Sequence, residues 1–142
     1  MKIHEIPGKM FTQWESDVKS ILDTWIDYDI TLDEFKKIFA FNMKQCTENG
    51  GIALIADSSK AEGVFSQEIQ EYITKEVFHI MYQKSIRYFI NIKPEIPGLT
   101  SLTVRRYSAN GGPSGIKIVD VGSVDDAKLW LRTHAFNEVP AE

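Results

Sequence analysis

The order of the apolar segments constrains the fold of this chain most strongly. Short β-type segments lie at residues 52–57, 87–92 and 116–121, and a long helical pattern separates the first of them from the second. Neighbouring parallel strands need a crossover connection, and a helix between two strands provides one. The sequence therefore predicts an α/β fold with a largely parallel sheet.

The N-terminal part of the chain predicts a β-hairpin. Two β-type segments at residues 10–14 and 20–26 flank the turn formers Glu15, Ser16 and Asp17. Residues 1–9 read as a polar lead-in that Pro7 and Gly8 interrupt. We expect residues 1–9 and 137–142 to be flexible ends of a single domain that spans residues 1–142.

Capping residues mark the starts of three predicted helices. Thr31 and Glu34 have the spacing of a capping box, and Ser66 and Ser123 are suitable N-caps. A weaker helical pattern covers residues 100–108. Apolar residues at helical spacing predict the inward faces of the three capped helices: Phe35, Ile38, Phe39, Met43 and Cys46; then Ile69, Tyr72, Ile73, Val77 and Ile80; then Val124, Ala127, Leu131 and Ala135.

Composition narrows the classes of protein to consider. With 142 residues, of which 43% are hydrophobic and 25% charged, the chain has the length and composition of one ordinary globular domain. The net charge of −4 argues against a nucleic-acid partner, and no apolar run reaches the ~20 residues that span a bilayer. Cys46 is the single cysteine and the N-terminus lacks a signal-like apolar segment, so we expect a cytoplasmic protein without disulfides.

Several segments together carry a resemblance to a known family. They are Trp25, the helix start TLDEF at 31–35, the strand end Ala56-Asp57, SQEIQEYITKEVF at 66–78, and VDDAKLWL at 124–131. From about Phe11 to His134 the chain resembles the STAS-like family of small bacterial proteins, which is related in fold to anti-sigma-factor antagonists and more distantly to CRAL-TRIO lipid-binding domains. The resemblance implies a mixed sheet of four or five strands with an N-terminal hairpin and helices packed mainly on one face.

The resemblance also points to a candidate phosphorylation switch. Ser58 and Ser59 follow Asp57 between a strand and a helix, where antagonist STAS domains carry a serine that a partner kinase phosphorylates. A phosphate would add nearly two negative charges and release a partner. Lys60 stands where those domains usually have glycine, and the alternative interpretation is an ordinary polar loop.

Four further residues stand out from their helical patterns. Glu76 falls within an apolar stripe, which predicts a buried acid with a partner. Phe41, Phe78 and Tyr82 fall outside the stripes of their helices, which predicts exposed aromatic side chains and a contact surface for self-association or a protein partner. The alternatives are a different helix phase or coverage by the N-terminal segment.

No motif in the sequence indicates a cofactor, a metal or an enzyme. His4, His79 and His134 are scattered, and Cys46 lies in an apolar stripe as a small hydrophobic residue. Two hypotheses follow. The first is a non-enzymatic, STAS-like regulatory or protein-interaction module that forms a homodimer or binds a protein partner. The second is a small-molecule or lipid-binding domain with a pocket at the C-terminal edge of the strands, near Asp57 and Pro94.

Overall fold

The computed structural model of this chain describes residues 2–93 and 115–136. In these residues a single six-stranded sheet has the strand order β1-β2-β3-β4-β5-β6. The strands are β1 (Lys2–Ile6), β2 (Met10–Glu15), β3 (Ser20–Trp25), β4 (Ala53–Asp57), β5 (Tyr88–Ile92) and β6 (Lys117–Val121). The first three strands pair antiparallel, and β3 to β6 pair parallel. The predicted mixed α/β sheet is confirmed, but its strand count of four or five is wrong.

The additional strand is β1, in the segment where the sequence shows only a polar lead-in. A turn with Gly8 at φ +75° connects it to β2, and glycine adopts that conformation without steric cost. Strand β1 lies at the edge of the sheet, where no apolar run is required.

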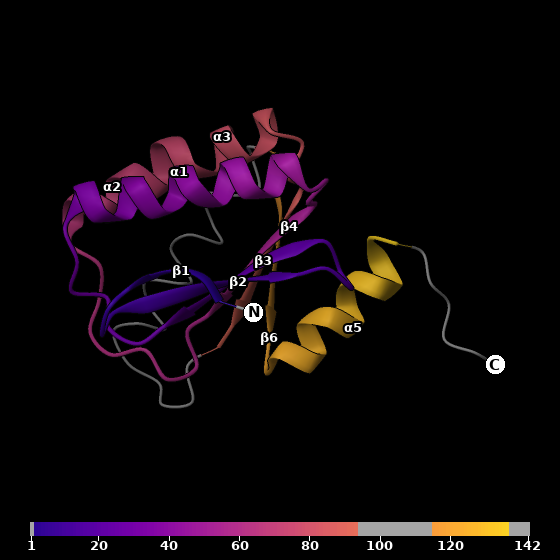
Figure 1. Cartoon of the computed structure of the whole chain (residues 1–142), viewed down its shortest axis with the longest axis horizontal. Coiled ribbons are helices and arrows are strands. Elements are labelled where there is room, and N and C mark those ends of the chain that lie inside the picture. Colours follow the sequence, from indigo (N-terminus) through magenta and orange to yellow (C-terminus); the bar gives the residue numbers. More distant parts are fainter. Residues whose placement is uncertain (1, 94–114, 137–142) are drawn as a thin grey trace.

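Helices cover both faces of the sheet (Figure 1). They are α1 (Leu32–Glu48), α2 (Gln67–Tyr72), the π-helical turn η1 (Ile73–Val77), α3 (Phe78–Gln83) and α5 (Val124–His134). Helix α1 and the continuous α2–η1–α3 segment lie on one face, and α5 packs on the other. Within the described residues, no helix has the combination of length and apolar composition that a membrane span requires.

The capping residues act as the sequence predicts. The Thr31 hydroxyl accepts from the Glu34 backbone N–H at 3.1 Å, and the Thr31 N–H donates to Glu34 Oε1 at 2.9 Å. The hydroxyls of Ser66 and Ser123 cap α2 and α5 at 3.2 and 3.1 Å. All five residues predicted for the inward face of α1 are buried.

The π-helical turn η1 changes which residues of the second helical segment point inward. A π-turn inserts one extra residue and rotates the residues that follow by about 100° relative to a continuous α-helix. The inward face continues through Val77, Phe78 and Met81, and Phe78 is only 2% exposed. The prediction of an outward Phe78 is therefore wrong, because it assumed a continuous α-helix.

Several predictions concern segments outside the described residues. These are the helix at 100–108, the pocket boundary at Pro94 and the C-terminal end at 137–142.

Candidate ligand-binding site

A row of polar residues crosses the face of the sheet that α1 covers. The strand register places Thr12 of β2 beside Asp23 of β3, Asp23 beside Ala56 of β4, and Ala56 beside Asn91 of β5. Thr12, Asp23 and Asn91 are at most 4% exposed. Burial of polar side chains in the middle of a sheet is costly unless hydrogen bonds compensate, so each of these residues needs a partner or a function.

Asp23 obtains its hydrogen bonds from two directions. Thr12 Oγ1 lies 2.7 Å from Asp23 Oδ1, and Asn42 Nδ2 of α1 donates to Asp23 Oδ2 at 2.8 Å. Burial raises the pKa of Asp23 from 3.8 to about 7, and the two hydrogen bonds offset only part of that effect. Near neutral pH the site therefore contains a carboxyl group that exchanges between its neutral and charged forms.

The polar row forms one wall of an internal cavity of about 60 Å³. The cavity lies between the sheet and the helices α1 and α2–η1, and each residue around it is at most 9% exposed. Aromatic and aliphatic side chains supply most of its surface: Trp25, Tyr28, Phe35, Ile38, Phe39, Leu54, Ala56, Phe65, Ile73, Val77 and Phe89. Its polar wall consists of Asp23, Asn42, Ser58 and Asn91.

Two side-chain atoms of the polar wall have no hydrogen-bond partner. They are Asn42 Oδ1, an acceptor, and Asn91 Nδ2, a donor; within the described part of the chain these are the unpartnered buried side-chain atoms. An unsatisfied buried polar atom costs about 1–3 kcal/mol. Apolar pockets with a few convergent polar groups are typical of small-molecule sites, so this arrangement is suited to bind a ligand.

Ser58 lies in the cavity wall rather than in an open loop. It is 1% exposed, and its hydroxyl forms a short hydrogen bond with that of Tyr28. Burial raises the pKa of Tyr28 to about 12. Ser58 belongs to the loop and turn that follow β4, but its hydroxyl is buried, and a kinase would reach it only if this part of the fold opened. Ser59 is half-buried, and its N–H donates to Asp57 Oδ1 at 3.0 Å.

Three of the other predicted site residues lie apart from the cavity. Glu76 is exposed on the π-turn, so the prediction of a buried acid is wrong because η1 changes the helix phase. Phe41 is half-buried and stacks on His4 of β1 with ring centroids 4.6 Å apart, as expected if the N-terminal segment covers it. Tyr82 is 45% exposed, and the Arg87 guanidinium lies 3.9 Å from its ring centroid.

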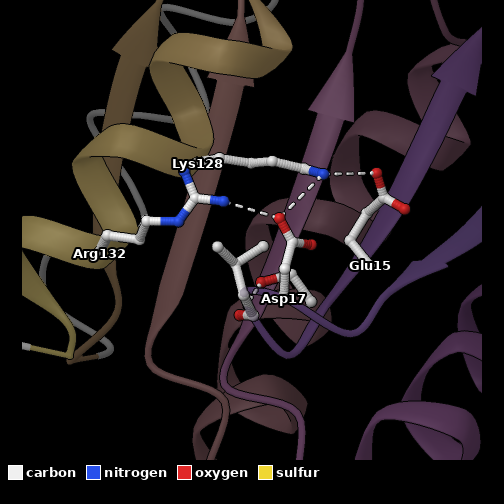
Figure 2. Close-up of polar contacts among 6 residues, drawn as sticks. Glu15, Asp17, Lys128 and Arg132 are labelled. Carbon is white, nitrogen blue, oxygen red and sulfur yellow. Dashed lines mark hydrogen bonds and ion pairs between the residues drawn. The ribbon is translucent and has the colours of Figure 1, made fainter.

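An ion-pair cluster fixes α5 on the opposite face of the sheet. Figure 2 shows Lys128 and Arg132 reaching from α5 to the β2–β3 hairpin. The Lys128 ammonium lies 3.1 Å from a Glu15 carboxylate oxygen and 3.2 Å from an Asp17 carboxylate oxygen, and Arg132 contacts Asp17 at 2.8 Å. The cluster links α5 to the hairpin that β2 and β3 form.

Asp23, Asn42 and Asn91 were not predicted as site residues, although each leaves a signal in the sequence. Asp23 and Asn91 interrupt strands that are buried on both faces, where apolar residues are expected throughout. Asn42 lies seven residues after Phe35 and so falls within the apolar stripe of α1. The predicted pocket at the strand C-termini is close to the observed cavity, which Ala56 and Ser58 line on either side of Asp57.

Neither metal-ligating residues nor comparisons with known proteins indicate a function for this site. Among the described residues, no group of three or more histidine, cysteine and acidic side chains could hold a metal ion. Comparison of the chain with models of known protein families, with curated proteins and with solved structures found no match. The function must therefore be inferred from the residues and geometry of the site itself.

Proposed function

We propose that this protein is a non-enzymatic module that binds a small, uncharged molecule in the cavity between the sheet, helix α1 and the π-turn η1. The observation that carries the proposal is the pair of unpartnered amide atoms, Asn42 Oδ1 and Asn91 Nδ2, in the wall of an otherwise apolar cavity. Such polar atoms fix the orientation of a ligand while aromatic side chains exclude water.

The size of the cavity limits the ligand. An apolar cavity of about 150 Å³ holds one benzene molecule, so a cavity of about 60 Å³ has room for a still smaller molecule. A molecule with a few non-hydrogen atoms fits this space, whereas an acyl chain requires displacement of the walls. The proposal therefore favours a small molecule over a lipid.

The residues around the cavity favour binding over catalysis. Among the described residues, neither histidine nor lysine lines it, the Asp23 carboxyl is engaged with Thr12 and Asn42, and the hydroxyl of Ser58 is engaged with Tyr28. A serine nucleophile needs an adjacent base, and Tyr28 with its raised pKa does not act as one near neutral pH.

Titration with three molecules of similar shape tests the proposal. Acetamide, acetone and acetate share a methyl group and a planar carbonyl-type centre and differ in the third substituent. The binding free energy of such small probes is at most about 1.5 kcal/mol per non-hydrogen atom, so their dissociation constants are about 0.04 mM or higher. The NMR titrations should therefore extend to probe concentrations of tens of millimolar. We expect at least one neutral probe to shift the backbone amide signals of β4, β5 and α1 in a saturable manner.

Two variants locate the binding. Ala56→Leu fills the cavity from the sheet and should abolish these shifts, whereas Ala40→Leu adds the same atoms to the exposed side of α1 and should preserve them. If neither acetamide nor acetone binds wild-type protein, or if Ala56→Leu binds the probes as well as wild type does, the proposed function is wrong.

A second candidate is a STAS-like regulatory role, in which the module contacts a protein partner or a second copy of itself. The observation that favours it is a surface groove of about 400 Å³ between α1 and α3, because Phe39 lines both this groove and the internal cavity. A ligand in the cavity would alter the position of Phe39 and thus the groove. Sedimentation velocity of wild type and of Ile80→Lys, which places a charge in the groove, tests this role; equal sedimentation of both as monomers would exclude self-association through it.

A further inference from the structure

The two unpartnered atoms of the cavity differ in their hydrogen-bonding character. Asn42 Nδ2 is committed to Asp23, which leaves Asn42 Oδ1 as an acceptor that needs a donor. Asn91 Nδ2 is a donor that needs an acceptor. A ligand that satisfies both must present one N–H or O–H group and one lone-pair oxygen.

The register of the sheet places Asp23, which accepts a hydrogen bond from Asn42, and Asn91 on either side of Ala56. Neighbouring strands lie about 4.8 Å apart, so Asp23 on β3 and Asn91 on β5 are separated by about twice that distance across β4. The small side chain of Ala56 lies between the two polar sides and lines the cavity. The aromatic side chains of Phe65 and Phe89 border the same space.

Charged ligands are a poor match to this site. An anion has no donor for Asn42 Oδ1 and is repelled by Asp23 when that carboxyl is ionised. An ammonium group has no acceptor for Asn91 Nδ2. Either ion would also lose its hydration in a cavity whose walls are largely apolar.

We propose that the cavity recognises a carboxamide group, whose N–H donates to Asn42 Oδ1 and whose carbonyl oxygen accepts from Asn91 Nδ2. This inference rests on the proposed function and names the chemical class of its ligand. A carboxamide is planar and neutral and carries the donor and the acceptor on neighbouring atoms, as the two asparagines require.

The three probes separate this inference from the proposed function. We expect acetamide to bind wild-type protein at least about tenfold more tightly than acetone, which lacks the donor, and acetate to produce no saturable shifts. If acetone binds as tightly as acetamide, or if acetate binds with comparable affinity, the carboxamide assignment is wrong while small-molecule binding stands. If acetamide and acetone both fail to bind, the proposed function fails together with the inference.

An Asn91→Leu variant provides a second test. Leucine has a similar size and removes a buried donor that has no partner, so the variant should fold at least as well as wild type. We expect its affinity for acetamide to fall at least about tenfold and its affinity for acetone to fall as well, because the carbonyl oxygen of each probe accepts from Asn91 Nδ2, while the preference for acetamide over acetone, which depends on Asn42 Oδ1, remains. An unchanged affinity for acetamide would show that Asn91 does not contact the ligand, and loss of the preference for acetamide over acetone would show that Asn42 Oδ1 does not receive the amide N–H; each result would overturn the assignment.

Discussion

Asn42 Nδ2 donates a 2.8 Å hydrogen bond to Asp23 Oδ2, which connects helix α1 to strand β3 at the wall of the cavity. The contact places a carboxyl group with a pKa near 7 under a helix that covers the sheet. The stability of the fold should therefore depend on whether Asp23 holds a proton.

The Asp23→Asn variant should remove a pH dependence of stability. The folded-state pKa of about 7 lies above the ordinary value of 3.8, so the contribution of Asp23 is fully present below pH 3.8 and is lost as pH rises toward and through 7. At about 1.4 kcal/mol per pKa unit, a shift of this size corresponds to a few kcal/mol. Asparagine keeps both hydrogen bonds, because the Thr12 hydroxyl can accept as well as donate.

Urea denaturation between pH 4.5 and 8 measures this effect. The free energy of unfolding of Asp23→Asn, relative to that of wild type, should rise with pH by a few kcal/mol. Asp120→Asn, which removes an exposed carboxylate on β6, is the control and should follow the wild-type profile. Parallel profiles for wild type and Asp23→Asn would show that the Asp23 carboxyl is ionised in the folded protein throughout this range.

Deletion of Lys75 should be tolerated because it converts the π-turn into a regular α-helix. After the deletion, the buried residues Ile73, Val77, Phe78 and Met81 fall at α-helical spacing on one face. Deletion of Lys37 from the regular helix α1 should instead rotate the residues after it out of the core and unfold the protein. Circular dichroism with thermal unfolding compares the two deletions; equal loss of structure in both would refute the helix phase described for η1.

Phe78 and Tyr82 should differ sharply in their effect on stability. Phe78 is 2% exposed and packs edge-on against Phe89, so Phe78→Ala should cost about 3–5 kcal/mol. Tyr82 is 45% exposed and contacts Arg87, so Tyr82→Ala should cost less than about 1 kcal/mol. Chemical denaturation measures both values, and similar losses would contradict the inward position of Phe78.

Lys128→Ala should weaken the attachment of α5 modestly and in a salt-dependent manner. Burial would raise the pKa of Asp17, but the hydrogen bond and charge of Lys128, together with Arg132, outweigh it and lower the pKa. This stabilisation is present above pH 3.8 and is lost as pH falls through the lowered pKa. Because the Asp17 side chain is 44% exposed, we expect a loss below about 1 kcal/mol.

Denaturation at low and high salt checks the contribution of Lys128. The difference between wild type and Lys128→Ala should shrink in 1 M salt and at pH 3, whereas Lys60→Ala, which changes an exposed loop residue, should have no effect at any condition. A difference that is unchanged by salt would mean that Lys128 acts through packing of its aliphatic stem.

Local sequence signals predicted the helix starts and five of the six strands. The capping residues Thr31, Ser66 and Ser123 work through contacts within three residues, so they are readable without knowledge of the fold. Edge strand β1 was missed because its pairing with β2 needs no apolar run. The π-turn was missed because its single extra residue is accommodated only through packing of Val77 and Phe78 against the sheet.

The site was less predictable than the fold. Asp23, Asn42 and Asn91 lie on three different elements, and the register of β3, β4 and β5 together with the packing of α1 on the sheet brings them to one cavity. Each is visible in the sequence as a polar residue among apolar ones, but their common position depends on long-range strand pairing.

Nuclear Overhauser contacts between bound acetamide and the protein test the central claim most directly. We expect the acetamide methyl protons to show contacts with the Ala56 methyl group and with the rings of Phe65 and Phe89, and Ala56→Leu to abolish them. Contacts to Met43, Tyr72 or Ile80, which line the groove between α1 and α3, or contacts that persist in Ala56→Leu, would contradict binding in the internal cavity.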